Sequence, residues 1–550
     1  PLTCVTFIQE PPASAAGLAT SRETMTIMEV TTARRMRPTL QEEPRAWPPI
    51  PFLSTLLSAR HRTIRCATIG IPRPKAHGLA EKKTSRSLTA VILAAGKGKR
   101  LKSSTPKVLH PICGKPALWH VLNAARAARP SKIVVVIGHG GDAVRDAVKS
   151  WGITPAPVFV EQSEQLGTGH AVLAAEKAVG RSTDVLVLGG DYDPVTGEHV
   201  RQLMSTHRRT KSAATILTTE VSDPGGYGRI LRTGDRLDRI VEHADATAAQ
   251  RAIHEVWLLV SAFRREDLFR VLPAVGRDNR QREYYLNEIF PILIDKGERV
   301  SVVQVDTGGA MGLNSRGGLA AVERVVRDRI NAGHLANGVT LIDPNTTYID
   351  VDVKIGADTV IRPNTFLEGA TRIGAGCDIG PSTRIADSTV GDGAMVTFAV
   401  VLGSKLGKQT GVGPYARLRP GCELASGAHA GAFVDLKAAK IGKGSKVPHL
   451  AYVGDAVIGS DVNIGAGTVT VNYDGYAKHI TTIKDGARVG SDTMLVAPVT
   501  VGKNSNTGAG SVITKDVPAG ALAVERAEQR VIPGYRKKKD AEHQQKREGK

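Results

Sequence analysis

An aliphatic residue recurs at every sixth position through most of the second half of the chain. The run begins near Val351, keeps its phase at Ile355 and Ile361, and continues to Ile513, often with a glycine directly after the aliphatic residue. A six-residue period is typical of a parallel β-helix, in which three hexapeptides make one coil and one side chain of each points inward. We therefore predict a left-handed parallel β-helix of roughly nine coils over residues 339–535.

The first half of the chain carries a different pattern, in which short apolar runs alternate with stretches long enough for helices. The runs are Leu88–Leu93, Ile133–Ile137, Val158–Val160 and Val185–Leu188. Strands that alternate with helices predict a Rossmann-like α/β sheet that is mostly parallel. A glycine-rich turn, residues 96–98, follows the first run, where ligands bind in such sheets. Because its backbone N–H groups can approach phosphate oxygens and Lys97 adds charge, we expect a phosphate-binding loop.

These patterns divide the chain into five segments. Residues 88–317 form the predicted α/β domain, residues 318–338 a linker helix, and residues 339–535 the β-helix. Residues 1–87 lack steady periodicity, which predicts a disordered extension, and residues 536–550 form a basic tail.

The formal net charge of +20 raises the question of nucleic-acid binding. Much of it lies at the two ends: residues 1–90 hold 13 basic and 6 acidic side chains, and residues 535–550 hold 7 and 3. No stacking platform or recognition-helix pattern accompanies them, so we expect solvated ends and no nucleic-acid partner. No run approaches the ~20 apolar residues of a membrane span. The five cysteines form no CxxC pair, which favours a reduced, cytoplasmic protein.

The glycine-rich turn belongs to a longer pattern. Residues 93–116, LAAGKGKRLKSSTPKVLHPICGKP, resemble the signature LAAGxGxRxxxxxPKxLxxxxGKP of sugar-1-phosphate nucleotidyltransferases. The resemblance implies that Arg100 holds the triphosphate and that Lys107 neutralises the phosphates in the transition state. It also implies four positions that meet the nucleotide: Leu93, Ala94, Ala95 and Gly96.

Further segments resemble one subgroup, the bifunctional N-acetylglucosamine-1-phosphate uridyltransferase/glucosamine-1-phosphate N-acetyltransferase family. They are residues 162–170 (QSEQLGTGH), 226–229 (GYGR), 240–243 (IVEH) and 312–316 (GLNSR). The first resembles the family's uracil-reading loop, in which Gln162 and Thr168 would recognise the base, and the second and third resemble its sugar-side loops. By this resemblance Asp191 and Asn314 hold Mg²⁺, which prefers oxygen ligands. The other UTP or sugar-nucleotide positions would be Gln162, Gly167, Thr168, Gly190, Gly228 and Glu242.

The α/β domain departs from this family at three places. Residues 190–194 read GDYDP instead of GDxPL, and residues 242–246 read EHADA instead of EHKDA. The family's N-[ST]-G becomes Trp257-Leu258-Leu259, although its asparagine bonds the sugar nucleotide. Because tryptophan is larger and accepts no hydrogen bond, we expect Trp257 to obstruct the pocket and weaken uridylyl transfer roughly ten- to a hundredfold.

The β-helix carries chemistry-bearing residues that fall outside its six-residue repeat. Residues 415–421 (YARLRPG), 433–437 (FVDLK) and 443–452 (KGSKVPHLAY) resemble the acetyltransferase half of the same family. An amine must be neutral to attack the acetyl-CoA thioester, so a histidine base suits the reaction, and the resemblance makes His449 that base. The implied glucosamine-1-phosphate positions are Arg419, Lys437, Tyr452, Asn463 and Lys478. The implied acetyl-CoA positions are Ala466, Asn472, Tyr473, Ser491, Ala509 and Arg526.

Together the resemblances imply a cytoplasmic homotrimer that acetylates glucosamine-1-phosphate and then couples the product to UTP with Mg²⁺, yielding UDP-N-acetylglucosamine. Four alternatives stay open at this stage. The chain could be an acetyltransferase with a degenerate uridyltransferase pocket, a nucleotidyltransferase whose β-helix only regulates, or a non-catalytic scaffold. It could also bind zinc between subunits, as γ-class carbonic anhydrases do, through His429, His449 and His479.

Overall fold

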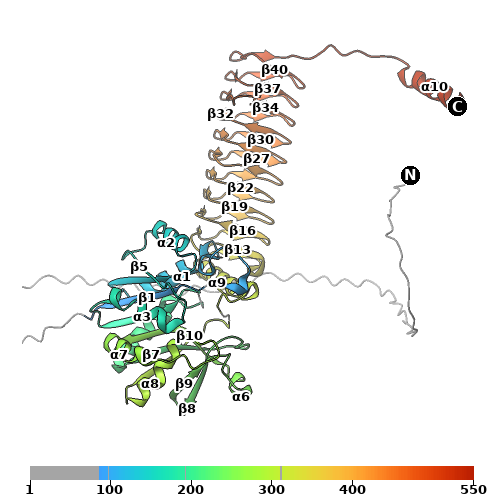
Figure 1. Ribbon diagram of the computed structural model, residues 1–550. Helices are drawn as coiled ribbons and strands as arrows, with labels where there is room; N and C mark the ends of the chain where they lie inside the picture. The colour runs from blue at the N-terminus through green and yellow to red at the C-terminus, as the bar shows by residue number, and fades with distance from the viewer. Residues whose placement is uncertain (1–85, 97, 192–193, 310–311, 550) are drawn as a thin grey trace, which may run out of the picture. The chain divides into compact units, whose positions relative to one another are not determined.

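The computed structural model describes residues 86–96, 98–191, 194–309 and 312–549 (Figure 1). The predicted extension at residues 1–87 therefore falls almost entirely outside the described residues, as do Lys97, Tyr192 and Asp193. The described residues form a nine-stranded mixed sheet with helices, followed by three long stacks of short parallel strands. This architecture confirms the predicted α/β nucleotidyltransferase fold followed by a left-handed parallel β-helix.

The mixed sheet has the strand order β11-β7-β10-β6-β1-β4-β5. Its central strand β1 (Leu88–Ala94) pairs in parallel with β4 (Lys132–Ile137) and β6 (Asp184–Gly189). Strand β10 (Glu255–Arg264) runs antiparallel to β6, so the sheet is not purely parallel. The other strands are β5 (Val158–Glu161), β7 (Ala214–Glu220), β8 (Arg229–Thr233), β9 (Arg236–Val241) and β11 (Val300–Gln304).

Helices cover both faces of this sheet because the side chains of β1 alternate between two apolar cores. Ala90 and Ile92 belong to one core, and Val91 belongs to the other. The first face is covered by α1 (Ala117–Arg126), α2 (Gly141–Ser150), α5 (Gly197–Thr210) and α9 (Arg316–Ala336). The second is covered by α3 (Thr168–Ala174), α4 (Glu176–Val179), α7 (Arg265–Val271) and α8 (Ile289–Asp295), while α6 (Ala248–Arg251) adds no buried residue.

The carboxyl ends of β1 and β6 meet at one edge of the sheet. Leu93 lies opposite Gly189, and the Gly190 N–H donates to the Leu93 carbonyl at 2.9 Å. The glycine-rich turn follows β1 directly, and Asp191 follows β6. After the turn come the short 3₁₀ helices η1 (Lys99–Leu101) and η2 (Lys107–Leu109), then the hairpin of β2 (Pro111–Ile112) and β3 (Lys115–Pro116).

The β-helix consists of three parallel sheets of 11, 10 and 9 strands, in which each strand pairs with the strand one coil away. The first sheet holds β12 (Thr340–Leu341), β15 (Val360–Ile361), β18 (Asp378–Ile379), β21 (Met395–Val396), β24 (Gly411–Val412), β27 (His429–Ala432), β30 (Lys446–His449), β33 (Asn463–Ile464), β36 (Arg488–Val489), β39 (Asn506–Thr507) and β41 (Leu522–Ala523). The second holds β13 (Thr347–Ile349), β16 (Thr365–Glu368), β19 (Arg384–Ala386), β22 (Val400–Leu402), β25 (Arg417–Leu418), β28 (Asp435–Lys437), β31 (Tyr452–Gly454), β34 (Val469–Val471), β37 (Met494–Val496) and β40 (Val512–Ile513). The third holds β14 (Lys354–Ile355), β17 (Arg372–Ile373), β20 (Thr389–Val390), β23 (Lys405–Leu406), β26 (Glu423–Leu424), β29 (Lys440–Ile441), β32 (Ala456–Ile458), β35 (Thr481–Ile483) and β38 (Val499–Val501).

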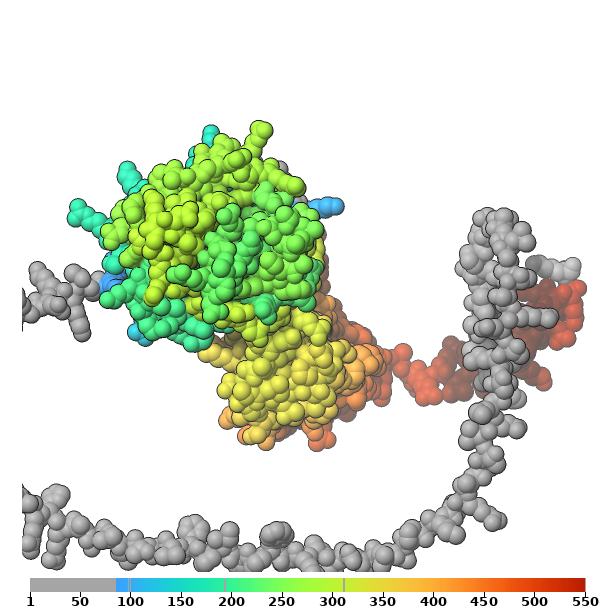
Figure 2. All heavy atoms as spheres, turned by 90° about the horizontal axis from the view of Figure 1, so that it is seen from below, coloured from blue at the N-terminus to red at the C-terminus, as the bar shows by residue number. Residues whose placement is uncertain are grey.

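The aliphatic residues of the hexapeptide repeat fill the interior of the coils. Ile361, Leu367 and Ile379 are fully buried and belong to one continuous apolar core. Figure 2 looks along the stack and shows the yellow atoms of the first coils packed into a solid surface. Buried hydroxyls also line the corners: Thr359 donates to the Gly374 carbonyl at 2.8 Å and Ser445 to the Gly459 carbonyl at 2.6 Å. These hydroxyls satisfy carbonyls that the turns leave unpaired.

Helix α9 joins the two folds, since its Ile330 packs against the β-helix core and against one core of the first domain. Most of the predicted basic tail, residues 536–550, lies in the exposed helix α10 (Tyr535–Glu548). Within the described ranges, no helix is both long and apolar enough to cross a membrane.

Two candidate active sites

A cavity of about 620 Å³ opens where β1 and β6 end. Eight of the predicted nucleotide positions line it: Leu93, Ala95, Gly96, Lys107, Gln162, Gly167, Thr168 and Asp191. The rest of the wall consists of Val108, Gln165, Ala171, Gly189, Leu259 and Glu283. The fold therefore gathers residues from six separate segments around one space of the size that ligand pockets have.

Lys107 forms the polar centre of this cavity. Its ammonium donates to the Asp191 carboxylate at 2.5 Å and to the Asn314 side-chain oxygen at 2.9 Å. Arg100 donates to the same Asn314 oxygen at 3.0 Å. Burial by itself would raise the pKa of Asp191, but the charge and hydrogen bond of Lys107 outweigh burial and lower it. The two predicted metal ligands, Asp191 and Asn314, thus both direct a side-chain oxygen toward the Lys107 ammonium. Oxygen is the donor type that suits Mg²⁺.

The loop predicted to read the base is held by backbone groups of its own and of residues 284–286. Gln162 is buried, and its side-chain amide donates to the Gly167 carbonyl at 3.1 Å. The Thr168 hydroxyl accepts from the Leu286 N–H at 2.9 Å. Gly167 has φ +110°, and a Cβ there would lie 2.6 Å from the Tyr284 carbonyl oxygen, so only glycine fits.

The two loops predicted to meet the sugar lie against each other. Arg229 is buried, and its guanidinium donates to the carbonyls of Tyr227 and Arg251. The Tyr227 hydroxyl accepts from the Gly312 N–H, which joins this loop to the segment that carries Asn314. A Cβ built on Gly228 would lie 3.5 Å from a Glu242 carboxylate oxygen, so those two predicted positions are neighbours.

Glu242 has an unusual acidity for a glutamate. Burial, and then the nearby carboxylates of Asp245, Glu288 and Glu283, raise the pKa of Glu242 to about 7. Near neutral pH this side chain can therefore donate or accept a hydrogen bond. Gly228 and Glu242 do not line the 620 Å³ cavity in the described structure, but the Gly228 carbonyl accepts from the Trp257 N–H at 3.0 Å, two residues before Leu259 of the cavity wall.

Trp257 does not obstruct the cavity as the sequence predicted. It is 4% exposed, packs edge-to-face against Phe290 at 5.7 Å between ring centroids, and donates through Nε1 to the Ser261 hydroxyl at 3.2 Å. The cavity wall contains Leu259 instead. The reason is an irregularity in β10, whose register against β7 shifts between Trp257 and Ser261.

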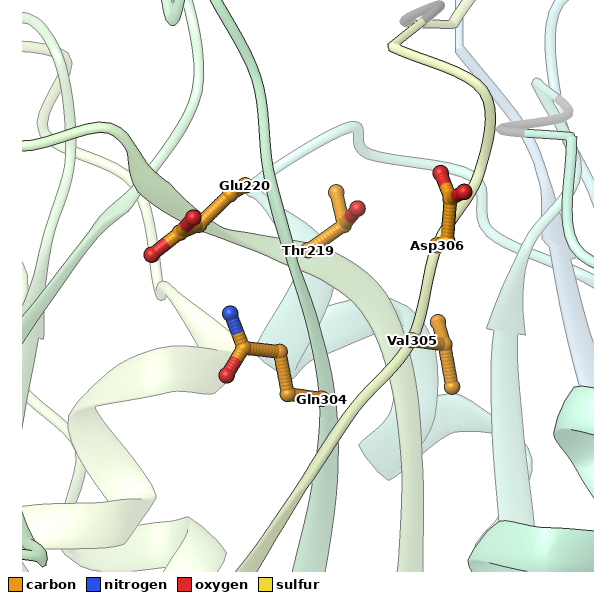
Figure 3. A pocket seen from close by; sticks show the side chains of 5 residues that line it. All are labelled: Thr219, Glu220, Gln304, Val305 and Asp306. Carbon is orange, nitrogen blue, oxygen red and sulfur yellow. The ribbon is translucent and has the colours of Figure 1, made fainter.

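A second cavity, of about 430 Å³, lies at the ends of β7 and β11 and is lined by none of the predicted site residues (Figure 3). Its walls are Thr219, Glu220, Gln304, Val305 and Asp306. The Asp306 carboxylate accepts from the Gly308 N–H at 2.7 Å and so supports its own loop.

Four of the five predicted sugar-phosphate residues, Arg419, Lys437, Tyr452 and Lys478, lie along the second sheet of the β-helix or in the loop after one of its strands, whereas Asn463 lies on the first sheet. The register places Arg419 level with Lys437, one coil away. Arg419 donates to the Asp435 carboxylate, with one contact at 2.9 Å, and Lys437 donates to Asp455 at 3.3 Å. Lys478 lies within hydrogen-bonding reach of Lys437, which lowers the pKa of Lys478. Crowded cations of this kind are typical of an anion-binding surface.

Polar neighbours complete this cluster. The Asn472 amide donates to the Asp455 carboxylate at 2.5 Å, so one carboxylate holds both Asn472 and Lys437. Tyr473 forms an isolated antiparallel β-bridge with Lys478, which closes a small loop. Tyr452 lies one coil from Asp435, and Asn463 lies one coil from Lys446 on the neighbouring sheet.

His449 is the last residue of β30 and is exposed. It lies opposite Ala432 in the coil before it, and its carbonyl accepts from the Gly467 N–H at 3.4 Å. The corner residue Leu450 follows directly, and Tyr452 starts the next strand of the second sheet. His449 and the cation cluster therefore lie on either side of one corner of the same coils, and the imidazole faces open surface in the single chain.

The predicted acetyl-CoA residues form a column farther along the stack. Ala466, Ser491 and Ala509 each follow a strand of the first sheet by two residues, one coil apart. The Gly510 N–H donates to the Ser491 carbonyl at 2.8 Å, and Arg526 donates to the Ala509 carbonyl at 3.1 Å. The column presents a run of small side chains beside a guanidinium.

Sequence reasoning missed several side chains that shape these sites. Gln165 lies in the predicted base loop, residues 162–170, and could have been included, whereas Glu283 lies in no recognised motif. Asp455, which bonds Lys437, likewise lies outside the segments that resemble the family. For the zinc alternative, the described part of the chain holds no cluster of three or more His, Cys, Asp or Glu residues suited to a metal ion.

Comparison with known proteins identifies both halves. Residues 90–285 match the MobA-like NTP transferase domain family. The chain is 48% identical to the bifunctional protein GlmU of Heliobacterium modesticaldum over 450 residues, which cover 81% of this chain and 97% of that protein. It is 47% identical to the bifunctional protein GlmU of Brevibacillus brevis, over 80% of this chain and 95% of that protein. The GlmU of Streptomyces avermitilis is also 47% identical, over 82% and 94% of the two chains. Because the match spans both domains at this level of identity, the chain belongs to the GlmU family of bifunctional proteins.

Proposed function

We propose that this chain makes UDP-N-acetylglucosamine from glucosamine-1-phosphate in two reactions, one in each domain. As a member of its family the chain is a bifunctional enzyme with acetyltransferase and uridyltransferase activities. The acetyl group comes from acetyl-CoA and the uridylyl group from UTP. Residues 88–317 carry uridylyl transfer, residues 318–338 connect the domains, and residues 339–535 carry acetyl transfer. The observation that carries the proposal is the Lys107 ammonium, which lies in the wall of the 620 Å³ cavity and donates to both Asp191 and Asn314.

In uridylyl transfer, a phosphate oxygen of N-acetylglucosamine-1-phosphate attacks the α-phosphorus of UTP, and the bond to pyrophosphate breaks. Lys107 and Arg100 stabilise negative charge on the phosphates. Gln162 and Thr168 orient the base, and Glu242 holds the sugar. Asp191 and Asn314 are the groups that would hold Mg²⁺, which when bound neutralises charge on the phosphates.

In acetyl transfer, the 2-amino group of glucosamine-1-phosphate attacks the thioester carbonyl of acetyl-CoA. A carbon–nitrogen bond forms, the carbon–sulfur bond breaks, and the thiol leaves as coenzyme A. His449 takes the proton from the amine. Arg419, Lys437 and Lys478 hold the sugar phosphate, with Tyr452 and Asn463 beside them. Acetyl-CoA lies along Ala466, Ser491, Ala509 and Arg526, next to Asn472 and Tyr473.

The acetyltransferase acts as a homotrimer in this proposal. Corner residues next to His449 are large, apolar and exposed: Tyr415 58%, Phe433 59% and Leu450 64%. Tyr415 and Phe433 stack at 5.2 Å and extend up the corner as a ridge. A neighbouring copy would cover this ridge and turn the open face at His449 into a cleft. The described cysteines, Cys113, Cys377 and Cys422, are free and buried, which supports a cytoplasmic location.

Acetyl transfer is tested with glucosamine-1-phosphate and acetyl-CoA by following the free thiol. We expect thiol release by the wild-type chain and a loss of about a hundredfold or more in His449→Ala, because general-base catalysis contributes that much. His429→Ala is the matched control, since His429 lies on the same sheet one coil away, and we expect it to stay active. Unchanged release in His449→Ala would remove His449 as the base.

Uridylyl transfer is tested separately with N-acetylglucosamine-1-phosphate, UTP and Mg²⁺ by following pyrophosphate. We expect release by the wild-type chain and a loss of about a hundredfold or more in Lys107→Ala, because a cation aimed at the transferring phosphate is lost. Lys102→Ala, a change at an exposed residue of the same segment, should leave the rate unchanged. No pyrophosphate from the wild-type chain would leave acetyl transfer as its sole activity.

A further inference from the structure

Leu259 combines two properties that seldom occur together. Its backbone is left-handed, with φ +49°, a region that leucine rarely adopts because its Cβ crowds the backbone. Its side chain also lines the 620 Å³ cavity. Residues in strained conformations persist where the surrounding structure determines them, and they cluster at functional sites.

The strain arises from the irregularity in β10. Pairing with β6 begins at Val260, opposite Leu188, while the register against β7 shifts between Trp257 and Ser261. Leu259 lies inside this interruption. The two residues before it are buried on opposite faces of the sheet, Trp257 in one apolar core and Leu258 in the other. The backbone therefore turns at Leu259 and directs its side chain toward the cavity.

The side chain of Leu259 lies next to the polar centre of the cavity. A Cβ built on Gly189 would lie 2.7 Å from the Leu259 Cδ2 atom and 3.0 Å from an Asp191 carboxylate oxygen. Leu259 and Asp191 therefore flank the same glycine. At the other end of this part of β10, the Trp257 N–H donates to the Gly228 carbonyl at 3.0 Å. Leu259 thus lies beside the phosphate centre, two residues along β10 from the position that bonds the loop assigned to the sugar.

We propose that Leu259 is a specificity-determining residue of the uridyltransferase site, whose isobutyl group limits the size of the substituent on the sugar phosphate. The inference rests on the proposed uridylyl transfer and adds the feature that restricts its substrate class. The site takes hexosamine 1-phosphates with a short N-acyl group and excludes longer acyl chains. Apolar contact and shape, rather than a hydrogen bond from β10, set this limit, because Trp257 points into the core.

The test compares pyrophosphate release from UTP with N-acetyl- and N-butanoylglucosamine-1-phosphate as acceptors, both supplied at limiting concentration. In Leu259→Gly the kcat/KM ratio of butanoyl to acetyl acceptor should rise about tenfold or more, the usual effect of room for one or two methylenes. The KM for UTP should stay within about twofold, because the base loop is untouched. Leu259→Ala should shift the ratio in the same direction, which keeps the test valid if the glycine variant folds poorly.

Stability separates this role from ordinary core packing. Leu259→Gly should melt higher than Leu259→Ala, because glycine alone relieves the left-handed strain. Leu258→Ala is the matched control: this neighbour is buried and does not line the cavity, so its melting temperature should fall by several degrees with no change in acceptor ratio. An unchanged ratio in both Leu259 variants, or an equal shift in Leu258→Ala, would overturn the inference. A wild-type chain that releases no pyrophosphate refutes the proposed uridylyl transfer itself, and the inference with it.

Discussion

Single residues show how the fold changes the chemistry of ordinary side chains. Lys107 connects Asp191 to Asn314, two residues that are more than a hundred positions apart in the chain. Glu242 lies half-buried among other carboxylates, and burial followed by those charges raises its pKa to about 7. In the unfolded chain a glutamate titrates near 4.5. Between these two values the folded protein binds more protons than the unfolded chain, so Glu242 lowers stability as pH rises through this window.

Replacing Glu242 by glutamine should therefore stabilise the first domain more at high pH than at low pH. Below about pH 4.5 the glutamate is protonated in both states, and the variant gains little. Above about pH 7 the wild type carries an unfavourable buried charge that glutamine lacks, and the gain should reach about 1 kcal/mol or more. Urea unfolding at about pH 5 and about pH 8 measures the difference. An equal effect at both pH values would contradict the raised pKa.

At the scale of elements, the hexapeptide coil leaves no space for a side chain at some of its glycines. A Cβ built on Gly442 would lie 2.2 Å from the carbonyl oxygen of Gly459 in the next coil. That atom is backbone and is fixed by the parallel pairing of β29 with β32. A Cβ built on Gly333, in helix α9, meets nothing within 4 Å.

The substitutions Gly442→Ala and Gly333→Ala should consequently have opposite effects. Gly442→Ala forces two coils apart and should cost about 1–3 kcal/mol. Gly333→Ala adds helix propensity in open space and should stabilise α9 by about 0.5–1 kcal/mol. Thermal unfolding of the two variants beside the wild type provides the comparison. A Gly442→Ala protein as stable as the wild type would show that the coils can separate at no cost.

At the scale of the whole molecule, the two catalytic domains have separate interiors. The β-helix core contains residues from 339 onward, whereas both cores of the first domain end by residue 326. Ile330 of α9 packs against cores of both. The β2–β3 hairpin adds two hydrogen bonds, one to the β-helix and one to α9. The Cys113 carbonyl accepts from the Val351 N–H at 3.1 Å, and the Cys113 N–H donates to the Glu323 carboxylate at 2.9 Å.

A fragment of residues 316–550, which keeps α9, should therefore fold without the first domain. Its core is complete, so we expect thiol release from glucosamine-1-phosphate and acetyl-CoA within about threefold of the full chain. Pyrophosphate release should be absent, because Lys107 and Asp191 are missing. Circular dichroism and the thiol assay check both statements. An unfolded fragment would show that the β-helix depends on contacts with the first domain.

The sequence by itself determined the features that follow from repetition and from short contiguous motifs. The six-residue period defined the β-helix because every sixth side chain must be apolar to fill a coil. The segment from Leu93 to Pro116 marked the nucleotide loop because its residues act together within one stretch of chain. The tertiary structure alone decided how distant segments meet. Leu259 rather than Trp257 faces the cavity because an irregularity in β10 turns the backbone between them, and neighbouring strands decide where such a turn occurs. Asp455 lies beside Lys437 because parallel coils bring residues about 18 positions apart into contact, which no local motif records.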